Sequence, residues 1–160
     1  MPESVFTGLV WVLAVSSGLM AGVYATFSAV IMKSLTRLEP DHAIQAMNAI
    51  NRTIVRTAFM PLFFGSTLVG ALMALHGFWS WQGPGALHAV AGGVIYVAGM
   101  FVSTIVVNVP LNNALARINP GTGDPTQHWD DYRVRWTRWN SARAIASGLT
   151  LVICLDLLAR

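Results

Sequence analysis

The sequence predicts an all-α protein of the membrane, an integral four-helix bundle in a single domain covering residues 1–160. Of its residues, 54% are hydrophobic and only 11% are charged, less than half of the roughly 25% charged residues of a soluble domain. Four apolar stretches are long enough, or nearly so, to cross a ~30 Å hydrocarbon core as helices. We place these spans at residues 5–32, 57–75, 86–107 and 140–158.

The net charge of +3 reflects membrane topology rather than nucleic-acid binding, because the arginines lie between apolar spans and form no long run. Basic residues gather in the first and third connectors, residues 33–56 and 108–139, whereas the second connector has none. The positive-inside rule predicts that both basic connectors are cytoplasmic and that both termini face outward. We expect the lipid bilayer as a partner, and no nucleic acid.

The first span, residues 5–32, is uncharged and longer than the ~20 residues that a bilayer requires, so it tilts or extends beyond the lipid. The N-terminus has no basic segment before this span. We therefore expect a retained helix rather than a cleaved signal peptide. Tyr24, Thr26 and Ser28 are polar enough to line a cavity, but their spacing alone does not decide it.

Glycines in two spans predict close helix packing. Gly18 and Gly22 form a small-xxx-small face in the first span, and Gly92, Gly93 and Gly99 make further small faces in the third. Such faces allow the backbones of neighbouring membrane helices to approach closely.

The first connector contains a helix of its own. Pro40 interrupts the connector, and Asp41 is a candidate N-cap for a helix that continues into the second span. Asn48 and Asn51 lie on one face of that helix.

The third span leads into the segment Asn-Val-Pro-Leu-Asn-Asn, residues 108–113. Thr104, Asn108 and Asn112 share a helical face because they are spaced i, i+4 and i+8. Pro110 should end or kink the helix near the membrane surface. Amide side chains at this depth require hydrogen-bond partners or water.

Residues 128–143, HWDDYRVRWTRWNSAR, form the densest polar and aromatic stretch of the chain. Read as a helix, the stretch places Trp136, Trp139, Asn140 and Arg143 on one face, at i, i+3, i+4 and i+7. We expect the other helices to pack around this stripe.

Arg143 is the best candidate for a charge inside the membrane. Twelve uncharged residues separate it from Asp156, which places the two charges roughly 20 Å apart on a helix, less than the ~30 Å hydrocarbon thickness. Asp156 lies near the chain end with Arg160 at i+4, so Arg143 is the more deeply placed of the two. An intramembrane charge indicates a functional site, although snorkelling to the interface is the alternative.

An internal repeat is also suggested by LTRLEP at residues 35–40 and LARINP at residues 115–120. An asparagine follows each copy in the next helix, Asn51 after the first and Asn140 after the second. The repeat predicts two pseudo-symmetric two-helix halves about an axis along the membrane normal, with Asn51 and Asn140 facing each other near it.

Sulfur and imidazole ligands are few. The single cysteine, Cys154, excludes a disulfide within the chain and is expected to be an inert buried thiol. His76 and His88 flank the second connector, and without a carboxylate or thiolate nearby they make a weak metal site. We expect no metal and no cofactor.

Four motifs resemble the anthrone oxygenase-like family of small four-span membrane proteins. They are AGVYATFSAVIMKSL (residues 21–35), Asn-Ala-Ile-Asn (residues 48–51), the segment 108–113, and Trp-x-x-Trp-Asn-x-x-Arg (residues 136–143). The resemblance covers nearly the whole chain. Fungal members oxidise polyketide anthrones to anthraquinones with molecular oxygen and without a bound cofactor, so the resemblance implies a hydrophobic aromatic substrate and an oxidoreductase activity.

Such a reaction requires a base for the benzylic proton, donors for the resulting oxyanion and an apolar slot for a flat ring system. We assign the catalytic donors to Arg143, Asn140 and Asn108. We assign substrate binding to Trp136, Trp139, Asn112 and Asn51. The base is not identified, because the nearby candidates, namely His128, Asp130, Asp131 and Tyr132, all lie off the stripe.

Two other functions stay open: a non-enzymatic small-molecule-binding or transport accessory protein, and a structural partner of another membrane protein. The enzyme requires the stripe to converge with Asn108 and Asn112 on an enclosed cavity. A cavity that no ionisable group reaches would favour the binding protein. A stripe that faces lipid or a neighbouring protomer would favour the structural partner. Homo-oligomerisation is not decided by the sequence.

Overall fold

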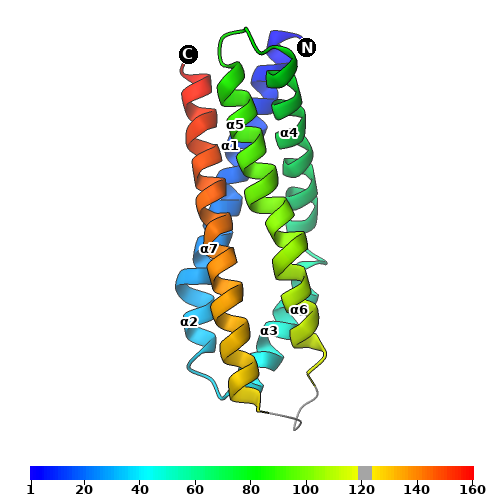
Figure 1. Cartoon of the computed structure of the whole chain (residues 1–160), viewed down its shortest axis with the longest axis vertical. Coiled ribbons are helices and arrows are strands. Elements are labelled where there is room, and N and C mark those ends of the chain that lie inside the picture. The colour runs from blue at the N-terminus through cyan, green and yellow to red at the C-terminus, as the bar shows by residue number, and fades with distance from the viewer. Residues whose placement is uncertain (119–123) are drawn as a thin grey trace.

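The protein is a bundle of long helices whose two termini lie at the same end (Figure 1). The computed structural model describes residues 1–118 and 124–160, and this part of the chain contains helices and no strands. Four helices are long and apolar enough to cross a membrane: Glu3–Leu35, Phe59–Trp79, Ala86–Ala116 and Pro125–Leu158. The predicted all-α membrane bundle is confirmed. Each spanning helix extends beyond its expected bounds at one end or both, although the second begins at Phe59 rather than at residue 57.

The first long helix comprises α1 (Glu3–Thr26), a π-helical segment η1 (Phe27–Ile31) and α2 (Met32–Leu35). A π-helical turn inserts an extra residue into the helical repeat, and such turns are frequent at functional sites. The π-helical segment contains Ser28 and follows Tyr24 by three residues, and both residues contribute to the site described below.

The helix of the first connector, α3 (Pro40–Ile54), differs from the expectation in two respects. Pro40 occupies the first turn and Asp41 follows it, so Asp41 is not the N-cap. Proline is well suited to the first turn because its φ is already helical and it has no N–H to leave unpaired. The helix also ends at Ile54 and does not continue into α4 (Phe59–Trp79). The Thr57 hydroxyl accepts a hydrogen bond from the Phe59 N–H, where the new helix begins.

The third long helix consists of α5 (Ala86–Tyr96), η2 (Val97–Val102), η3 (Thr104–Asn108) and α6 (Val109–Ala116). Pro110 was expected to end or kink the helix, but it lies in the first turn of α6 and the helix continues to Ala116. The change from π-helical to α-helical pairing just before Pro110 places the proline where a missing N–H matters least.

The last helix, α7 (Pro125–Leu158), joins the polar stretch 128–143 and the fourth span in one rod of 34 residues. Asp124 caps it by accepting hydrogen bonds from the N–H groups of Thr126 and Gln127, at 2.9 and 3.4 Å. The expected fourth span, residues 140–158, is therefore only the apolar end of a much longer helix.

Two clusters of buried side chains hold the bundle together. One fills the half nearer the termini and includes Leu13, Met73 and Tyr96. The other joins α2, α3, α6 and α7 at the opposite end and includes Met47 and Trp129. The site described below lies where these two clusters meet.

Glycine packing is tight in the third helix but not in the first. A Cβ on Gly93 would overlap the Gly70 carbonyl oxygen and lie 2.7 Å from the Ala74 Cβ, so α4 and α5 are in close backbone contact there. A Cβ on Gly22 would meet nothing within 4 Å, and one on Gly18 would be at an ordinary 3.5 Å from Leu151. The expected close approach is confirmed for Gly93 and is wrong for Gly22.

The internal repeat stays a prediction. Asn119 and Pro120, which end its second copy, lie outside the described residues. Asn51 and Asn140 do reach the same cavity, as the repeat anticipates.

Candidate functional site

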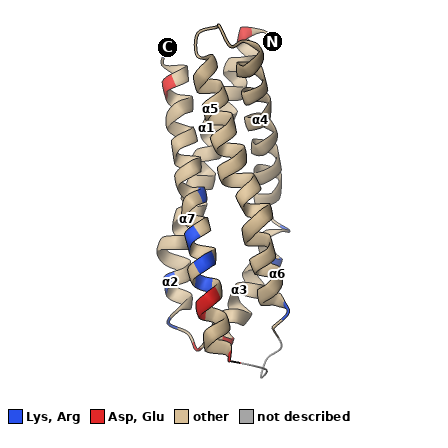
Figure 2. Ribbon diagram, viewed as in Figure 1, with Lys and Arg blue, Asp and Glu red and all other residues tan. Residues whose placement is uncertain are grey.

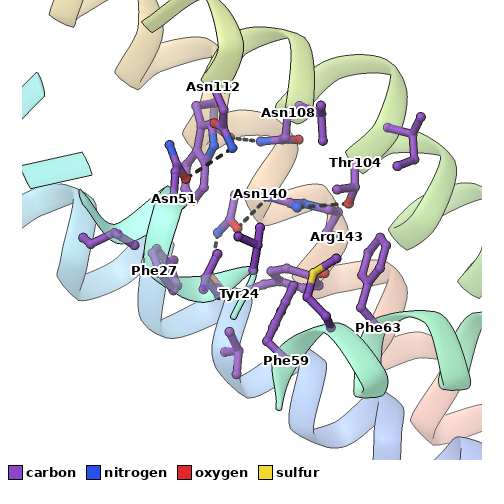
Figure 3. Close-up of a pocket in the computed structure, with 18 of the residues that line it drawn as sticks. Tyr24, Phe27, Asn51, Phe59, Phe63, Thr104, Asn108, Asn112, Asn140 and Arg143 are labelled. Atoms are coloured by element: carbon purple, nitrogen blue, oxygen red, sulfur yellow. Dashed lines mark hydrogen bonds between the residues drawn. The ribbon is translucent and has the colours of Figure 1, made fainter. Parts of the chain in front are cut away.

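A cavity of about 160 Å³ opens inside the bundle and is lined from α1, η1, α3, α4, η3, α6 and α7. One part of its wall is aromatic and carries the rings of Phe27, Phe59 and Phe63 (Figure 3). Opposite these rings, Figure 3 shows the polar side chains gathered together. These are Asn51, Thr104, Asn108, Asn112, Asn140 and Arg143.

Arg143 is the charged centre of this cavity, and only 4% of the residue is exposed. Its Nη1 donates to the Thr104 hydroxyl at 3.0 Å and its Nη2 donates to the Asn140 Oδ1 at 2.9 Å. The guanidinium carbon lies 4.4 Å from the ring centroid of Tyr24 and 5.6 Å from that of Trp136. Among the described residues, no carboxylate lies within salt-bridge distance of Arg143. The buried charge is thus held by neutral groups and aromatic faces.

Asn140 fixes the position of Arg143. It is fully buried, and its Nδ2 donates to the Tyr24 carbonyl at 2.6 Å and to the Ser28 hydroxyl at 2.7 Å. Its Oδ1 is left to accept from Arg143. One carboxamide therefore joins α7 to the end of α1 and orients the guanidinium.

A row of amide contacts extends from Arg143 toward α3. The Tyr132 hydroxyl donates to the Asn112 Oδ1 at 2.9 Å, and the Asn112 Nδ2 donates to the Asn51 Oδ1 at 3.2 Å. The Asn108 Nδ2 donates to the Trp136 carbonyl at 3.4 Å. These bonds join α3, the third helix and α7 without any charged group, and they define the polar wall of the cavity.

Several buried polar atoms of the cavity residues have no hydrogen-bond partner among the described residues. They are the Tyr24 hydroxyl, Asn51 Nδ2, Asn108 Oδ1, Trp136 Nε1 and Arg143 Nε. An unsatisfied buried polar group costs about 1–3 kcal/mol, and each requires an explanation such as a ligand. Four of the five atoms are donors, so the group fits a ligand that presents acceptor oxygens.

The structure brings most of the sequence-predicted site together. Six of the seven assigned residues line the cavity: Asn51, Asn108, Asn112, Trp136, Asn140 and Arg143. Trp139 does not; its side chain is 43% exposed on the outside of the bundle, whereas Trp136 is 5% exposed. Consecutive helical residues point about 100° apart, so Trp139 is turned away from the face that carries Asn140. The face of the last helix that lines the cavity therefore carries Trp136, Asn140 and Arg143 but not Trp139.

None of the suggested bases lines the cavity. His128, Asp130 and Asp131 are exposed, and Asp130 pairs with Arg133 at 2.6 Å. Tyr132 is buried, but its hydroxyl is bound to Asn112. Tyr24 is an ionisable residue that does line the cavity. The sequence left its placement open, and the only indication was its polarity within an apolar span. The aromatic wall of the cavity could not be predicted from the sequence, because phenylalanines are common in membrane spans.

The two histidines near the second connector occupy separate surroundings. His76 packs its ring against Phe6 at 4.8 Å between centroids. His88 lies 3.3 Å from an Asp156 oxygen, a carboxylate that the sequence did not place beside it. The described residues contain no cluster of three or more His, Cys, Asp or Glu side chains arranged to hold a metal ion. Cys154 is a buried free thiol, as expected.

Comparison with known proteins identifies the family. A sequence model described as anthrone oxygenase matches residues 50–153, more than half of the chain. No curated protein matches, and no solved structure matches. The matched segment contains α4, the whole third helix and most of α7, together with all of the cavity residues except those of α1 and η1. The chain belongs to the anthrone oxygenase family.

Proposed function

We propose that this protein is an oxygenase that oxidises a flat, hydrophobic aromatic ketone of the anthrone class with O2 and without a bound cofactor. The observation that carries the proposal is Arg143, a cation buried in an apolar cavity with no carboxylate among the described residues to neutralise it. An intramembrane charge marks a functional site by default. A cation so placed favours a substrate that carries negative charge while it reacts.

The dimensions of the cavity suggest how such a substrate is seated. A void of about 150 Å³ takes a benzene-sized ring, and this cavity has a volume of about 160 Å³. We propose that the oxygen-bearing edge of the substrate lies deep, against Arg143 and Tyr24. The remaining rings extend toward the exposed apolar side chains that also line the cavity. These side chains are Val55, Phe64, Ile105 and Val109.

The proposed reaction converts a ring CH2 and O2 into a ring C=O and water. Loss of one CH2 proton gives a carbanion whose charge is shared with the ketone oxygen. One electron passes from this anion to O2, and the resulting radical and superoxide combine to form a C–O bond. Protonation gives a hydroperoxide. Loss of the second ring proton and cleavage of the O–O bond release water and leave the new carbonyl.

Arg143 and Tyr24 stabilise the anion that the first of these steps produces. The unpaired Arg143 Nε–H and Tyr24 O–H donate to its negatively charged oxygen. Donors placed in advance in a water-poor site stabilise such charge by several kcal/mol, and removal of one donor typically lowers kcat about 10²–10³-fold. Asn140 acts as a positioning residue, because it holds the guanidinium in place.

In this proposal water accepts the CH2 proton. No histidine or carboxylate lines the cavity among the described residues. We propose that the cavity selects the anion that forms by the substrate's own ionisation. The rate at limiting substrate then rises with pH until the substrate is fully ionised.

The charge distribution in Figure 2, with Lys and Arg concentrated at the end opposite the termini, supports an orientation with the termini outward.

The experiment compares wild type, Arg143→Gln and Arg135→Gln, purified in detergent with a simple anthrone as substrate. Arg135 is an exposed arginine of the same helix outside the cavity, so its variant is matched in charge. We expect one O2 consumed per anthraquinone formed, unchanged in Arg135→Gln and at least 10²-fold slower in a folded Arg143→Gln. Anthrone oxidation no faster than the spontaneous background in wild type would contradict the proposal and favour the binding-protein alternative.

A further inference from the structure

A second hollow, separate from the cavity, lies on the outer surface between the end of the first long helix and α7. It is a groove of about 400 Å³, and we call it the basic groove. Its polar lining is three cations and four hydroxyl groups: Lys33, Arg133, Arg138, Ser28, Thr36, Thr137 and Ser141. Val134 contributes an exposed apolar side chain.

Two of the three cations are uncompensated. Arg133 donates through Nε to an Asp130 oxygen at 2.6 Å. Neither Lys33 nor Arg138 lies within salt-bridge distance of a carboxylate in residues 1–118 and 124–160. Ammonium and guanidinium groups are donors that recognise a phosphate group. Of the four hydroxyls, those of Thr36 and Ser141 already donate within the protein, so the two cations are the main donors of the groove. The groove therefore has the composition of a phosphate site.

The depth of the groove matches the lipid phosphates. Arg138 precedes Asp156 by eighteen positions on α7, which corresponds to about 27 Å along a helix. This is close to the ~30 Å hydrocarbon thickness. With Asp156 and Arg160 at one membrane surface, Arg138 lies at the other, and Arg143 lies within the hydrocarbon. A groove at Arg138 thus opens at the level of the headgroups.

An apolar track leads from the groove toward the other membrane surface. Ile145, Leu149 and Val152 follow Ser141 at i+4, i+8 and i+11, on the same face of α7. They are 63%, 51% and 62% exposed. An acyl chain lying on this track would continue from a phosphate bound in the groove, which distinguishes a membrane lipid from a soluble phosphate.

We propose that the basic groove binds the phosphate of an anionic phospholipid, with Lys33 and Arg138 as its charged contacts and the Ile145–Leu149–Val152 face under its acyl chain. Basic pockets between membrane helices at the cytoplasmic surface recognise anionic headgroups in this way. The site adjoins the cavity, because Ser141 donates to Ser28 at 2.9 Å and Ser28 also accepts from Asn140. The proposal concerns binding and is independent of the proposed oxygenase activity.

The test is native mass spectrometry of the detergent-purified protein titrated with phosphatidylglycerol or phosphatidylcholine of identical acyl chains. We compare wild type, Lys33→Gln/Arg138→Gln and Arg135→Gln, the last being an exposed arginine of α7 outside the groove. We expect wild type to bind phosphatidylglycerol at least tenfold more tightly than phosphatidylcholine. The double variant loses this preference and Arg135→Gln keeps it, because only the double variant removes the two charges that line the groove. Lys33→Gln alone should lose part of it, and serves if the double variant does not fold.

Three results would overturn the proposal. Equal affinity of wild type for the two lipids would exclude recognition of the anionic headgroup. An equal loss in Arg135→Gln and the double variant would show general surface attraction rather than a site. Displacement of the lipid by inorganic phosphate at comparable concentration would show a site for the free anion, without a contribution from the acyl chain.

Discussion

The guanidinium carbon of Arg143 lies 4.4 Å from the ring centroid of Tyr24, so the charge of the last helix rests on an aromatic face of the first. A desolvated cation–π contact contributes about 2 kcal/mol. The cost of taking an arginine out of water is several kcal/mol, and two neutral hydrogen bonds offset only part of the remainder. The charge is therefore incompletely compensated, and an anionic ligand would complete its environment.

The Tyr24 hydroxyl can be tested apart from its ring. In Tyr24→Phe the ring stays beneath Arg143 and only an unpaired buried hydroxyl is lost. We expect the free energy of unfolding to change by less than about 1 kcal/mol, while kcat/KM for anthrone oxidation falls about tenfold or more.

Tyr96→Phe is the matched control for Tyr24→Phe. The Tyr96 hydroxyl is also buried, but it donates to the Ser66 hydroxyl at 2.8 Å, outside the cavity. This variant should lose about 1 kcal/mol of stability with unchanged kcat/KM. Equal kinetics in the two variants would remove Tyr24 from the site.

The two tryptophans of the Trp-x-x-Trp motif should behave differently. Trp136 lines the cavity and packs its ring 5.8 Å from that of Phe27, whereas Trp139 lies on the outer surface. We expect Trp136→Leu to raise KM for an anthrone about tenfold, because the flat face against the substrate is lost. Trp139→Leu should leave KM within about twofold of wild type. A larger effect at Trp139 would contradict the placement of the substrate.

The contact between α4 and α5 should be intolerant of a single methyl group. In Gly93→Ala the new Cβ would overlap the Gly70 carbonyl and crowd Ala74, so we expect a loss of about 1–3 kcal/mol in unfolding free energy. Gly22→Ala, where the new Cβ meets nothing within 4 Å, should be neutral or stabilising because alanine favours the helix. Unfolding in mixed detergent measures both, and equal stabilities would show that the helices are not in contact at Gly93.

The fold could be predicted because a membrane imposes it: apolar length gives the spanning helices. Helix ends were harder to predict. Pro110 was expected to end or kink the helix; the helix does not end there but continues to Ala116, with the proline in the first turn of α6 directly after a π-helical segment.

The polar residues of the cavity could also be predicted from the sequence. Asn108, Asn112 and Arg143 are costly in a membrane and must point inward. Trp139 was grouped with these residues but does not line the cavity, because an indole is equally suited to a membrane interface. The sequence left open whether Tyr24 lines a cavity, and it did not predict the phenylalanines of the cavity wall. Apolar and weakly polar residues are common in a membrane span whether they face a cavity or not.

Stabilisation of an aromatic oxyanion by the cavity can be measured without turnover. A hydroxyanthraquinone absorbs at different wavelengths when neutral and when ionised. Titrated into wild-type protein at a pH where the free dye is mostly neutral, it should bind with the spectrum of the ionised form. Bound to folded Arg143→Gln, it should show the neutral spectrum, with Arg135→Gln behaving as wild type. A neutral bound spectrum in wild type, or an ionised one in Arg143→Gln, would contradict the account.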